Sequence, residues 1–440
     1  MTCAAPPATH ARNVVDQRSA CRASPSFADV LSGDVAAVGQ GAKATMKIVH
    51  IITRLIVGGA QENTLLSCEG QHDRGHDVTL ITGPAIGPEG SLLERATSYG
   101  YRVETIDAMR RSILPFKDWS TYRGLIRRLR EIKPDVVHTH SSKAGIIGRW
   151  AAYKAGVPMI VHTIHGLAFT ASTRKIVNGF YRLAEKFTAP ITTKIVCVAD
   201  AMAEQSLANH IGRPDQYVTV YSGMDTAPFL DPPVSRGEIR RRLGLADEHV
   251  AVGTIARLFD LKGHEDLLAA APELCGKFPN LRFLWVGDGL LRGDFESQIA
   301  RMNLVDRFIL TGLVPPSRVP ELTNAMDILV HPSRREGLAR ALPQGALAGC
   351  PVIAYDIDGN REGLLDGVSG YAIPPFDAAR LSAALEVLLD RPAMRKTMGE
   401  AGRAFALGRF DAKVMVDALE RVYRNSPPPA QARAENNVYS

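Results

Sequence analysis

The 440-residue sequence has no apolar run that approaches the roughly 20 residues a helix needs to cross a bilayer. Its six cysteines are scattered, and no two of them form a Cys-x-x-Cys pair. This spacing argues against zinc and dithiol redox motifs, so we expect buried thiols in a reducing cytoplasm. The formal net charge of +6 is modest; it permits an anionic partner without identifying one.

Two further patterns are absent. The Gly-rich loop with Gly58 and Gly59, which follows the first apolar strand, is not Gly-x-Gly-x-x-Gly, so a dinucleotide fingerprint is missing. No carboxylate or cysteine stands at metal-ligand spacing beside the histidines at positions 138, 140, 162 and 165. We therefore expect no resident metal, no organic cofactor and no nucleic-acid partner.

The two ends of the chain differ from the rest. Residues 1–45 are rich in Ala, Ser, Pro and Gly, and they lack the apolar core of a signal peptide. We expect them to be a disordered extension, and residues 426–440 a disordered tail. A strand begins abruptly at Met46, which suggests the hypothesis that Met46 is the true initiator.

Between these ends, short apolar strands alternate with longer amphipathic segments, a pattern typical of α/β folds with parallel sheets. The alternation breaks at the Pro-rich segment Asp225–Val234. We expect one doubly wound domain over residues 46–228 and a second over residues 229–410. The expected strands are Ile48–Ile52, Val78–Ile81, Arg102–Ile106, Val136–His138, Met159–Thr163, Lys194–Val198, Tyr217–Tyr221, His249–Ile255, Leu281–Val286, Phe308–Thr311, Ile328–Val330, Val352–Ala354 and Gly370–Ile373.

The most informative segment runs from His331 to Gln344, between two apolar strands of the second domain. It contains Glu336, Gly337 and Leu338 just before a stretch rich in Ala and Leu. We expect a helix to start there, and helix N-termini suit anionic ligands. The main-chain N–H groups of Gly337 and Leu338 would then face a phosphate.

A basic loop is the second candidate element. Arg257 and Lys262 follow a strand and precede a helix, and two cations on one loop can hold a diphosphate. The alternative is a solvated basic loop. Gly287 and Asp288 form a third, weaker element, since glycine permits close approach to a ligand but Gly-Asp-Gly is also a common turn.

In order and spacing these segments resemble the retaining GT-B glycosyltransferases, most closely glycosyltransferase family 4, from Met46 to about Arg424. The family signature is Glu, seven residues, Glu; here the pair is Glu336 and Gln344, so the second carboxylate has become an amide. The family pattern Arg, four residues, Lys-Gly matches at Arg257. The resemblance implies two Rossmann-like domains facing across a cleft, with a last helix, residues 411–425, completing the first domain.

The resemblance also assigns roles in the second domain. Glu336 would contact hydroxyls of the donor sugar, and Gln344 the ribose, although Gln344 as a surface amide stays open. The backbone around Leu313 would cover the base. Glu362 matches a family acid, with a helix-capping or surface role equally open. Arg257 and Lys262 would stabilise the diphosphate as it leaves.

In the first domain the resemblance places the Gly58-Gly59 loop over the phosphates and the acceptor. It places His165 near the transferred sugar, although a lone histidine at a strand end is usually structural. His140 is the weaker candidate, and we expect it to be structural.

Together with these residues, the resemblance implies a cytoplasmic, metal-independent, retaining hexosyltransferase. It would move a sugar from a nucleotide-diphosphate donor, expected to be a UDP-sugar, to a glycan or lipid-linked acceptor in cell-envelope polysaccharide synthesis. One alternative is a nucleotide-sugar epimerase on the same fold. Another is a non-catalytic envelope-assembly protein that binds nucleotide-sugar or lipid.

A membrane contact is a separate hypothesis. The segment Tyr122–Lys133 places Leu125, Leu129 and Ile132 on one stripe with arginines around it. The segment is either an ordinary core-packed helix or a surface that docks onto anionic lipid at the inner face of the cell membrane.

Overall fold

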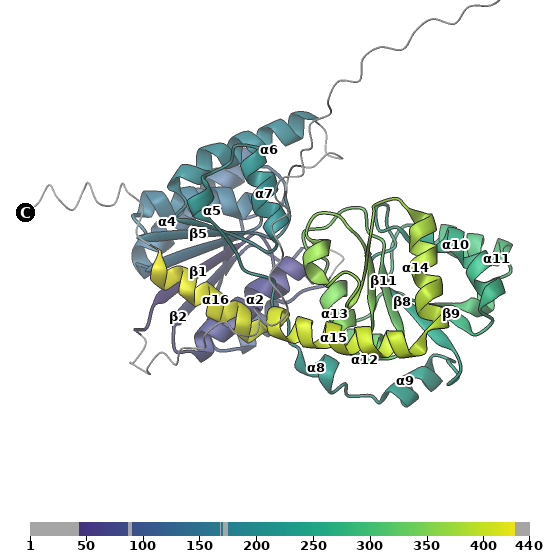
Figure 1. Ribbon diagram of the computed structural model, residues 1–440. Helices are drawn as coiled ribbons and strands as arrows, with labels where there is room; N and C mark the ends of the chain where they lie inside the picture. Colours follow the sequence, from purple (N-terminus) through teal and green to yellow (C-terminus); the bar gives the residue numbers. More distant parts are fainter. Residues whose placement is uncertain (1–43, 87–89, 168, 170–174, 427–440) are drawn as a thin grey trace, which may run out of the picture. The chain divides into compact units, whose positions relative to one another are not determined.

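The computed structural model describes residues 44–86, 90–167, 169 and 175–426. Most of the two expected terminal extensions therefore lies outside the described residues. The described residues from Thr45 onward belong to one compact unit. In it, helices cover both faces of two parallel sheets (Figure 1).

All thirteen expected strands are present, with bounds that differ by a few residues. The first sheet has seven strands in the order β3-β2-β1-β4-β5-β6-β7, and the second has six in the order β10-β9-β8-β11-β12-β13. Every pairing between these thirteen strands is parallel. The strands are β1 Lys47–Ile52, β2 Asp77–Thr82, β3 Arg102–Thr105, β4 Val136–His140, β5 Met159–Ile164, β6 Lys194–Cys197, β7 Tyr217–Thr219, β8 Val250–Ile255, β9 Leu281–Val286, β10 Phe308–Leu310, β11 Ile328–His331, β12 Val352–Tyr355 and β13 Gly370–Ile373.

Helices connect the strands and shield both faces, so the central strands are apolar along nearly their whole length. Five of the six residues of β1 are buried, for example. The helices are α2 Gly59–Asp73, α3 Leu93–Ser98, α4 Pro115–Ile132, α5 Ser142–Ala155, α6 Lys175–Thr188, α7 Asp200–Ala208, α8 Ala227–Leu230, α9 Arg236–Arg242, α10 His264–Lys277, α11 Arg292–Arg301, α12 Val319–Asn324, α13 Ala341–Leu347, α14 Ala378–Asp390, α15 Pro392–Phe410 and α16 Ala412–Asn425.

In each sheet the strand order reverses between two central neighbours. These are β1 and β4 in the first sheet, and β8 and β11 in the second. Ligands of doubly wound sheets bind outside the carboxyl ends of the strands at such a reversal. The loops that follow β1, β8 and β11 contain Gly58, Lys262 and Glu336, and His140 ends β4, so the topology gathers predicted site residues at both reversal points.

The last helix, α16, packs on α2 and closes the core of the first sheet (Figure 1). Its apolar side lies in one buried cluster with Ile48 of β1, Val136 of β4 and Val196 of β6. The buried residues that α16 contributes to this cluster are Met415, Val416, Leu419, Val422 and Tyr423.

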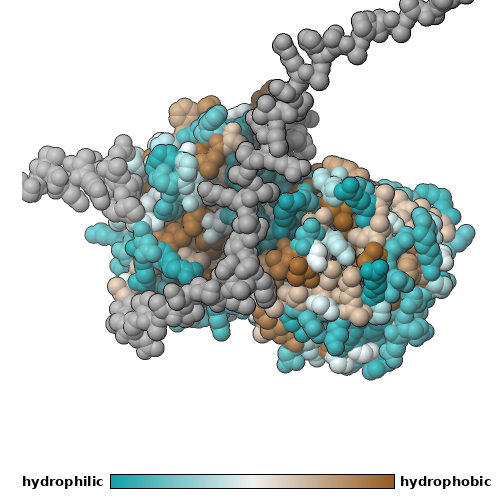
Figure 2. Space-filling model, viewed as in Figure 1, coloured by the Kyte–Doolittle hydropathy of each residue, from teal (hydrophilic) through white to brown (hydrophobic). Residues whose placement is uncertain are grey.

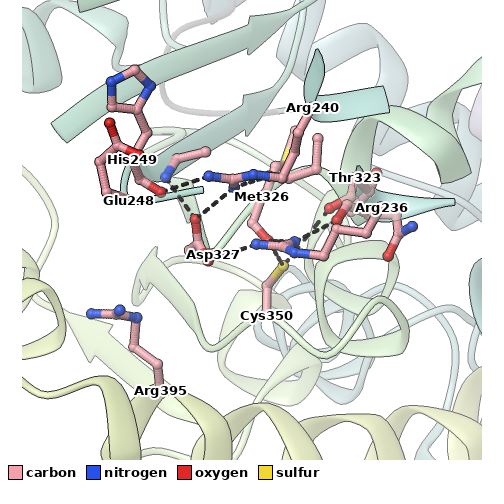
Figure 3. A network of polar contacts seen from close by, with 12 residues as sticks. Arg236, Arg240, Glu248, His249, Thr323, Met326, Asp327, Cys350 and Arg395 are labelled. Carbon is pink, nitrogen blue, oxygen red and sulfur yellow. Dashed lines mark hydrogen bonds and ion pairs between the residues drawn. The ribbon is translucent and has the colours of Figure 1, made fainter. Parts of the chain in front are cut away.

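The basic helix α9 has a structural role. Asp327, just before β11, accepts hydrogen bonds from Arg236 (2.7 Å) and Arg240 (3.1 Å), as Figure 3 shows. Arg240 is buried and also donates to the carbonyl oxygen of Ala325 (3.0 Å). These arginines anchor α9 to the second sheet rather than offer a binding surface for anions.

Helices α4 and α6 belong to the first half of the chain, the part that forms the first sheet, and they place their apolar side chains differently. On α4, Leu125 and Leu129 are buried in the core, so the stripe proposed to meet lipid belongs to a core-packed helix. Helix α6 instead exposes large apolar side chains, and Figure 2 shows hydrophobic residues at the surface of this upper part of the first half. The exposed fractions are 88% for Ile176, 54% for Phe180, 55% for Leu183 and 63% for Phe187. No helix among the described residues combines the length and apolarity that a membrane span requires.

Candidate functional site

The structure brings two predicted site residues into direct contact at the β8–β11 reversal. The Lys262 ammonium lies 2.5 Å from Oε1 of Glu336, and Nε2 of His331 lies 3.0 Å from the same oxygen. The Glu336 main-chain N–H donates to Asp358 (3.1 Å). Lysine and carboxylate therefore come together from loops 74 residues apart.

Glu336 is a strong hydrogen-bond acceptor in this setting. Burial alone would raise its pKa, but the hydrogen bond with His331 and the charge of Lys262 lower the pKa to about 2. At neutral pH the side chain is therefore an ionised carboxylate, which can accept hydrogen bonds from hydroxyl groups but has no proton to donate.

The predicted helix start at Glu336 is wrong. Helix α13 begins at Ala341 and spans seven residues to Leu347, so Gly337 and Leu338 lie in an irregular segment before it. A neighbouring loop holds that segment, since Gly359 N–H donates to the Gly337 carbonyl (2.9 Å) and Asn360 accepts from Ala339 N–H (3.4 Å). These outside partners replace the helical hydrogen bonds that the sequence pattern favoured.

Gly337 brings the Glu336 segment against the first half of the chain. A Cβ atom at position 337 would lie 2.5 Å from the main-chain oxygen of His165, and one at Gly359 would lie 2.3 Å from the Gly337 oxygen. Both distances are shorter than real contacts allow, so the backbones of His165, Gly337 and Gly359 can pack this closely only with glycines at 337 and 359. His165 is thereby held next to the segment that carries Glu336.

His165 is neutral and tied to the interior. Burial and the charge of Arg340 lower its pKa to about 3, and its Nε2 lies 3.1 Å from Nδ1 of His140. His140 is fully buried and also contacts His50 (2.9 Å), which fits the structural role expected for it. His50 was not singled out in the sequence, because it looks like one polar residue within an apolar strand.

Arg257 lies on the same loop as Lys262 but is exposed, with its guanidinium 5.0 Å from the centre of the Phe259 ring. Gly263 ends this loop in a left-handed conformation (φ 74°), where a Cβ atom would lie 1.9 Å from the Pro332 oxygen. The basic loop is thus seated against the segment that leads to Glu336.

The third element, Gly287-Asp288, packs against the basic loop. A Cβ atom at Gly287 would lie 2.1 Å from the Ala256 oxygen, and Leu258 N–H donates to the Asp288 carbonyl (3.0 Å). Leu313, predicted to cover the base, follows Gly312 and is 74% exposed. The predicted elements therefore adjoin one another at the carboxyl ends of β8 and β9.

Gln344 lines a pocket of about 910 Å³ together with Gly59, Glu62 and Arg340. Arg340, the residue before α13, contacts Glu62 of α2 (3.0 Å) and donates to the Gly223 carbonyl (3.1 Å). It therefore connects α13 to the helix that follows the Gly-rich loop. The neighbouring Gly58 has an extended backbone (φ 174°), which does not require glycine. Arg340 was not assigned a role from sequence, because its partners Glu62 and Gly223 are distant in the chain.

Glu362 has the capping role that the sequence left open. Its carboxylate accepts from the main-chain N–H groups of Asp200 (2.7 Å) and Ala201 (3.1 Å), at the first turn of α7. A negative charge there offsets the unpaired donors and the positive end of the helix. Its contact with the donor remains a prediction.

Among the described residues, one group of histidines has ligand atoms within 4.8 Å of one another: His50, His138 and His140. Each ring nitrogen in this group already has a hydrogen-bond partner, which are Gln71, Tyr423, Thr163, His165 and the histidines themselves. The geometry therefore describes a hydrogen-bonded cluster rather than a set of free ligands.

Two doubly wound parallel sheets, with a glycine-rich loop at the reversal point of the first and a basic loop at that of the second, are typical of GT-B glycosyltransferases. Residues 58–223 match the family described as Glycosyl transferase 4-like domain, and residues 235–405 match Glycosyl transferases group 1. The chain therefore belongs to the glycosyltransferase family that these two matches describe.

Individual relatives agree with this assignment. D-inositol 3-phosphate glycosyltransferase of Acidothermus cellulolyticus is 30% identical over 395 residues, covering 83% of this chain and 85% of the relative. UDP-Gal:alpha-D-GlcNAc-diphosphoundecaprenol alpha-1,3-galactosyltransferase of Escherichia coli is 29% identical over 382 residues, covering 86% and 96%. The crystal structure of Anabaena HepE with UDP has the same fold, with a TM-score of 0.74 and 21% identity over 86% of this chain and 100% of HepE.

Proposed function

We propose that the protein is a metal-independent, retaining hexosyltransferase of family 4. It moves a sugar from a UDP-sugar to a glycan or lipid-linked acceptor in cell-envelope polysaccharide synthesis. The observation that carries the proposal is the Lys262–Glu336 pair at the carboxyl ends of β8 and β11. Further support comes from the E. coli relative, named for a UDP-Gal donor and a diphosphoundecaprenol acceptor, and from HepE bound to UDP.

In this proposal the cations act on the leaving group. Arg257 and Lys262 stabilise the negative charge that develops on the diphosphate, the task that a metal ion performs elsewhere. Lys262 exchanges part of its contact with Glu336 for a phosphate oxygen, and the ionised Glu336 then accepts hydrogen bonds from sugar hydroxyls. Gln344, in the pocket with Arg340, meets the ribose.

Retention follows in this proposal from substitution on the face that the diphosphate leaves. Lys262 and His331 both hold Oε1 of Glu336, which favours an anchoring role for this carboxylate over attack on the sugar. The leaving phosphate takes the proton of the acceptor hydroxyl while the new glycosidic bond forms. His165, held beside the Glu336 segment by Gly337, lies next to the transferred sugar.

The first experiment is a thermal-shift screen of nucleotides and nucleotide-sugars, because a ligand at 100 times its dissociation constant adds about 2.7 kcal/mol of stability. The selected donor is then incubated with glycan and lipid-diphosphate acceptors, with and without EDTA, and the anomeric configuration of the product is read by NMR. We expect EDTA-resistant transfer with retention. Inversion, or loss of activity in EDTA, would contradict the corresponding part of the proposal.

The same assay separates the alternatives. An epimerase would convert the donor sugar with no acceptor present. A non-catalytic binding protein would give a thermal shift with the donor but no turnover with any acceptor.

We further propose that the protein docks on anionic lipid at the inner face of the cell membrane through α6, not α4. Ile176, Phe180, Leu183 and Phe187 stand at helical spacing on one exposed stripe, and the exposed cations Arg182 and Lys186 flank it. Trp150 and Tyr153 on the adjoining α5 are also partly exposed, and such rings favour the lipid–water interface.

Vesicle co-sedimentation at low salt tests this surface. We expect binding to vesicles that contain anionic lipid, and loss of binding in Phe180→Ser/Leu183→Ser. Val305→Ser, which removes an apolar side chain 60% exposed in the second half, is the matched control and should bind as the unaltered protein does. Equal binding of both variants to the vesicles would refute the proposal. A dimer that depends on α6 and does not bind the vesicles would refute it as well.

A further inference from the structure

A continuous row of hydrogen bonds leads from the interior of the first sheet to His165. Oε1 of Gln71 lies 2.8 Å from Nε2 of His50. Nδ1 of His50 lies 2.9 Å from Nε2 of His140, and Nδ1 of His140 lies 3.1 Å from Nε2 of His165. The row runs from α2 across β1 and β4 to the residue after β5.

The three histidines of this row are neutral. Gln71, His50 and His140 have no exposed surface. Burial lowers the pKa of His50 to about 4 and that of His140 well below its usual value, while burial and the charge of Arg340 lower that of His165 to about 3. A neutral imidazole carries one N–H donor and one lone-pair acceptor, so each ring must donate on one side and accept on the other.

The amide of Gln71 then sets the direction of every bond. Its Nε2 donates to the Tyr423 hydroxyl (3.2 Å), which leaves Oε1, an acceptor only, facing His50. His50 must therefore carry its proton on Nε2 and accept at Nδ1. The same rule puts the proton of His140 on Nε2, and that of His165 on Nε2 as well.

We propose that Gln71, His50 and His140 are positioning residues that hold His165 with its proton on Nε2, so that its Nδ1 offers a lone pair to a hydroxyl of the sugar substrate. The inference rests on the proposed function, which gives His165 its place beside the transferred sugar. It adds a specific role to three buried residues that do not touch the substrate.

The row is suited to fixing a tautomer rather than to conducting protons. It ends at a carboxamide, which has no group that takes up a proton near neutral pH. A proton arriving at His165 would therefore have no exit at the far end. The contribution of the row is to remove the choice between two tautomers before the substrate arrives.

The test compares two deletions in the same buried cluster. Gln71→Met keeps the length of the side chain but removes the acceptor. Thr163→Val is the matched control: Thr163 is also buried, and its hydroxyl lies 2.6 Å from Nε2 of His138, outside the row. Gln71→Glu is the rescue, because at about pH 9, where histidine is neutral, a carboxylate oxygen accepts the same bond.

The primary readout is 15N NMR of the histidine rings, which reports directly which nitrogen carries the proton. We expect a single Nε2–H form of His165 in the unaltered protein, in Thr163→Val and in Gln71→Glu, and a mixture of forms in Gln71→Met. The second readout is kinetic. In Gln71→Met, kcat/KM for the nucleotide-sugar should fall about fivefold, the size of one neutral hydrogen bond, while binding of the free nucleotide stays unchanged.

Three results would overturn the inference: Nδ1–H on His165 in the unaltered protein, an unaltered tautomer in Gln71→Met, or an equal loss in Thr163→Val. If Gln71→Met does not fold, the unaltered protein and Gln71→Glu still decide the tautomer. Failure of the proposed function would look different from failure of this inference. The protein would then transfer no sugar, whereas the NMR spectra could still show His165 with its proton on Nε2.

Discussion

Arg257 and Lys262 stand on one loop but have different surroundings, so their removal should have different side effects. Arg257→Ala should lower turnover about 10²–10³-fold, because it deletes a cation aimed at charge that develops on the leaving group. Its stability should hardly change, since the side chain is exposed. Steady-state kinetics and urea unfolding provide the measurements, and near-normal turnover would refute the diphosphate assignment.

Lys262→Ala should lose turnover to a similar extent and also lose stability. Of the side chains that the structure describes, the Glu336 carboxylate would keep only His331 as a partner, so the pKa of Glu336 should rise and unfolding should need about 1–3 kcal/mol less. Lys262→Arg restores the charge and serves as the control in the same urea titration. A stable Lys262→Ala protein would mean that the ion pair contributes little to the fold.

Gln344 tests the ribose assignment. A charge-assisted hydroxyl bond exceeds a neutral one by about 1 kcal/mol, so Gln344→Glu should tighten donor binding roughly fivefold. Gln344→Ala should weaken it. Arg340 lines the same pocket and would offset the added negative charge. Calorimetric titration with the donor decides: identical affinities in both variants would make Gln344 a plain surface residue.

Sequence patterns located single site residues well where the residues next to them in the chain form a recognisable motif. Lys262 and Glu336 were predicted from their positions at strand ends together with the family resemblance, and the structure joins them. Gln71 and Arg340 escaped notice because their partners are distant in the chain, at His50 and at Glu62. No local pattern reports such contacts.

Among the structural elements, the loop before α10 offers a paired test of glycine. Gly263→Ala should destabilise the protein by at least about 1–3 kcal/mol, because its φ is 74° and the added Cβ would meet the Pro332 oxygen. Gly276→Ala, in α10 with open space around it, should instead stabilise by about 0.5–1 kcal/mol. Thermal unfolding of both variants gives the comparison, and a neutral Gly263→Ala would show that the loop relaxes.

Strands were easier to predict than helix ends. Every expected strand is present because a strand covered on both faces leaves a continuous apolar run. The start of α13 was misplaced by five residues, since Gly359 and Asn360 hold the preceding segment from outside. The α4 stripe was ambiguous because a core-packed helix and a lipid-facing helix share one sequence pattern.

For the whole molecule, buried neutral histidines predict sensitivity to acid. Burial lowers the pKa of His50 to about 4 and the pKa values of His138, His140 and His162 well below their usual range. Below about pH 6.5 the unfolded chain binds protons that the folded protein does not, so stability falls as pH falls. Each such histidine contributes a slope of up to about 1.4 kcal/mol per pH unit.

Urea titrations between about pH 8 and about pH 5 should show this loss. His162, which lies outside the Gln71–His165 row, provides the check: His162→Gln should reduce the slope by up to about 1.4 kcal/mol per pH unit. A flat profile would mean that the cluster takes up protons while folded.

The return of α16 to the first sheet has a consequence for synthesis on the ribosome. The sheet begins at Lys47, but Tyr423, whose hydroxyl contacts both Gln71 and His138, is translated 352 residues after Gln71. Until then the apolar faces of β1 and β4 that α16 covers stay open, and the nascent first half depends on chaperones or on delayed folding. A premature stop codon just before α16 would spare every described strand of both sheets and still expose the core of the half translated first.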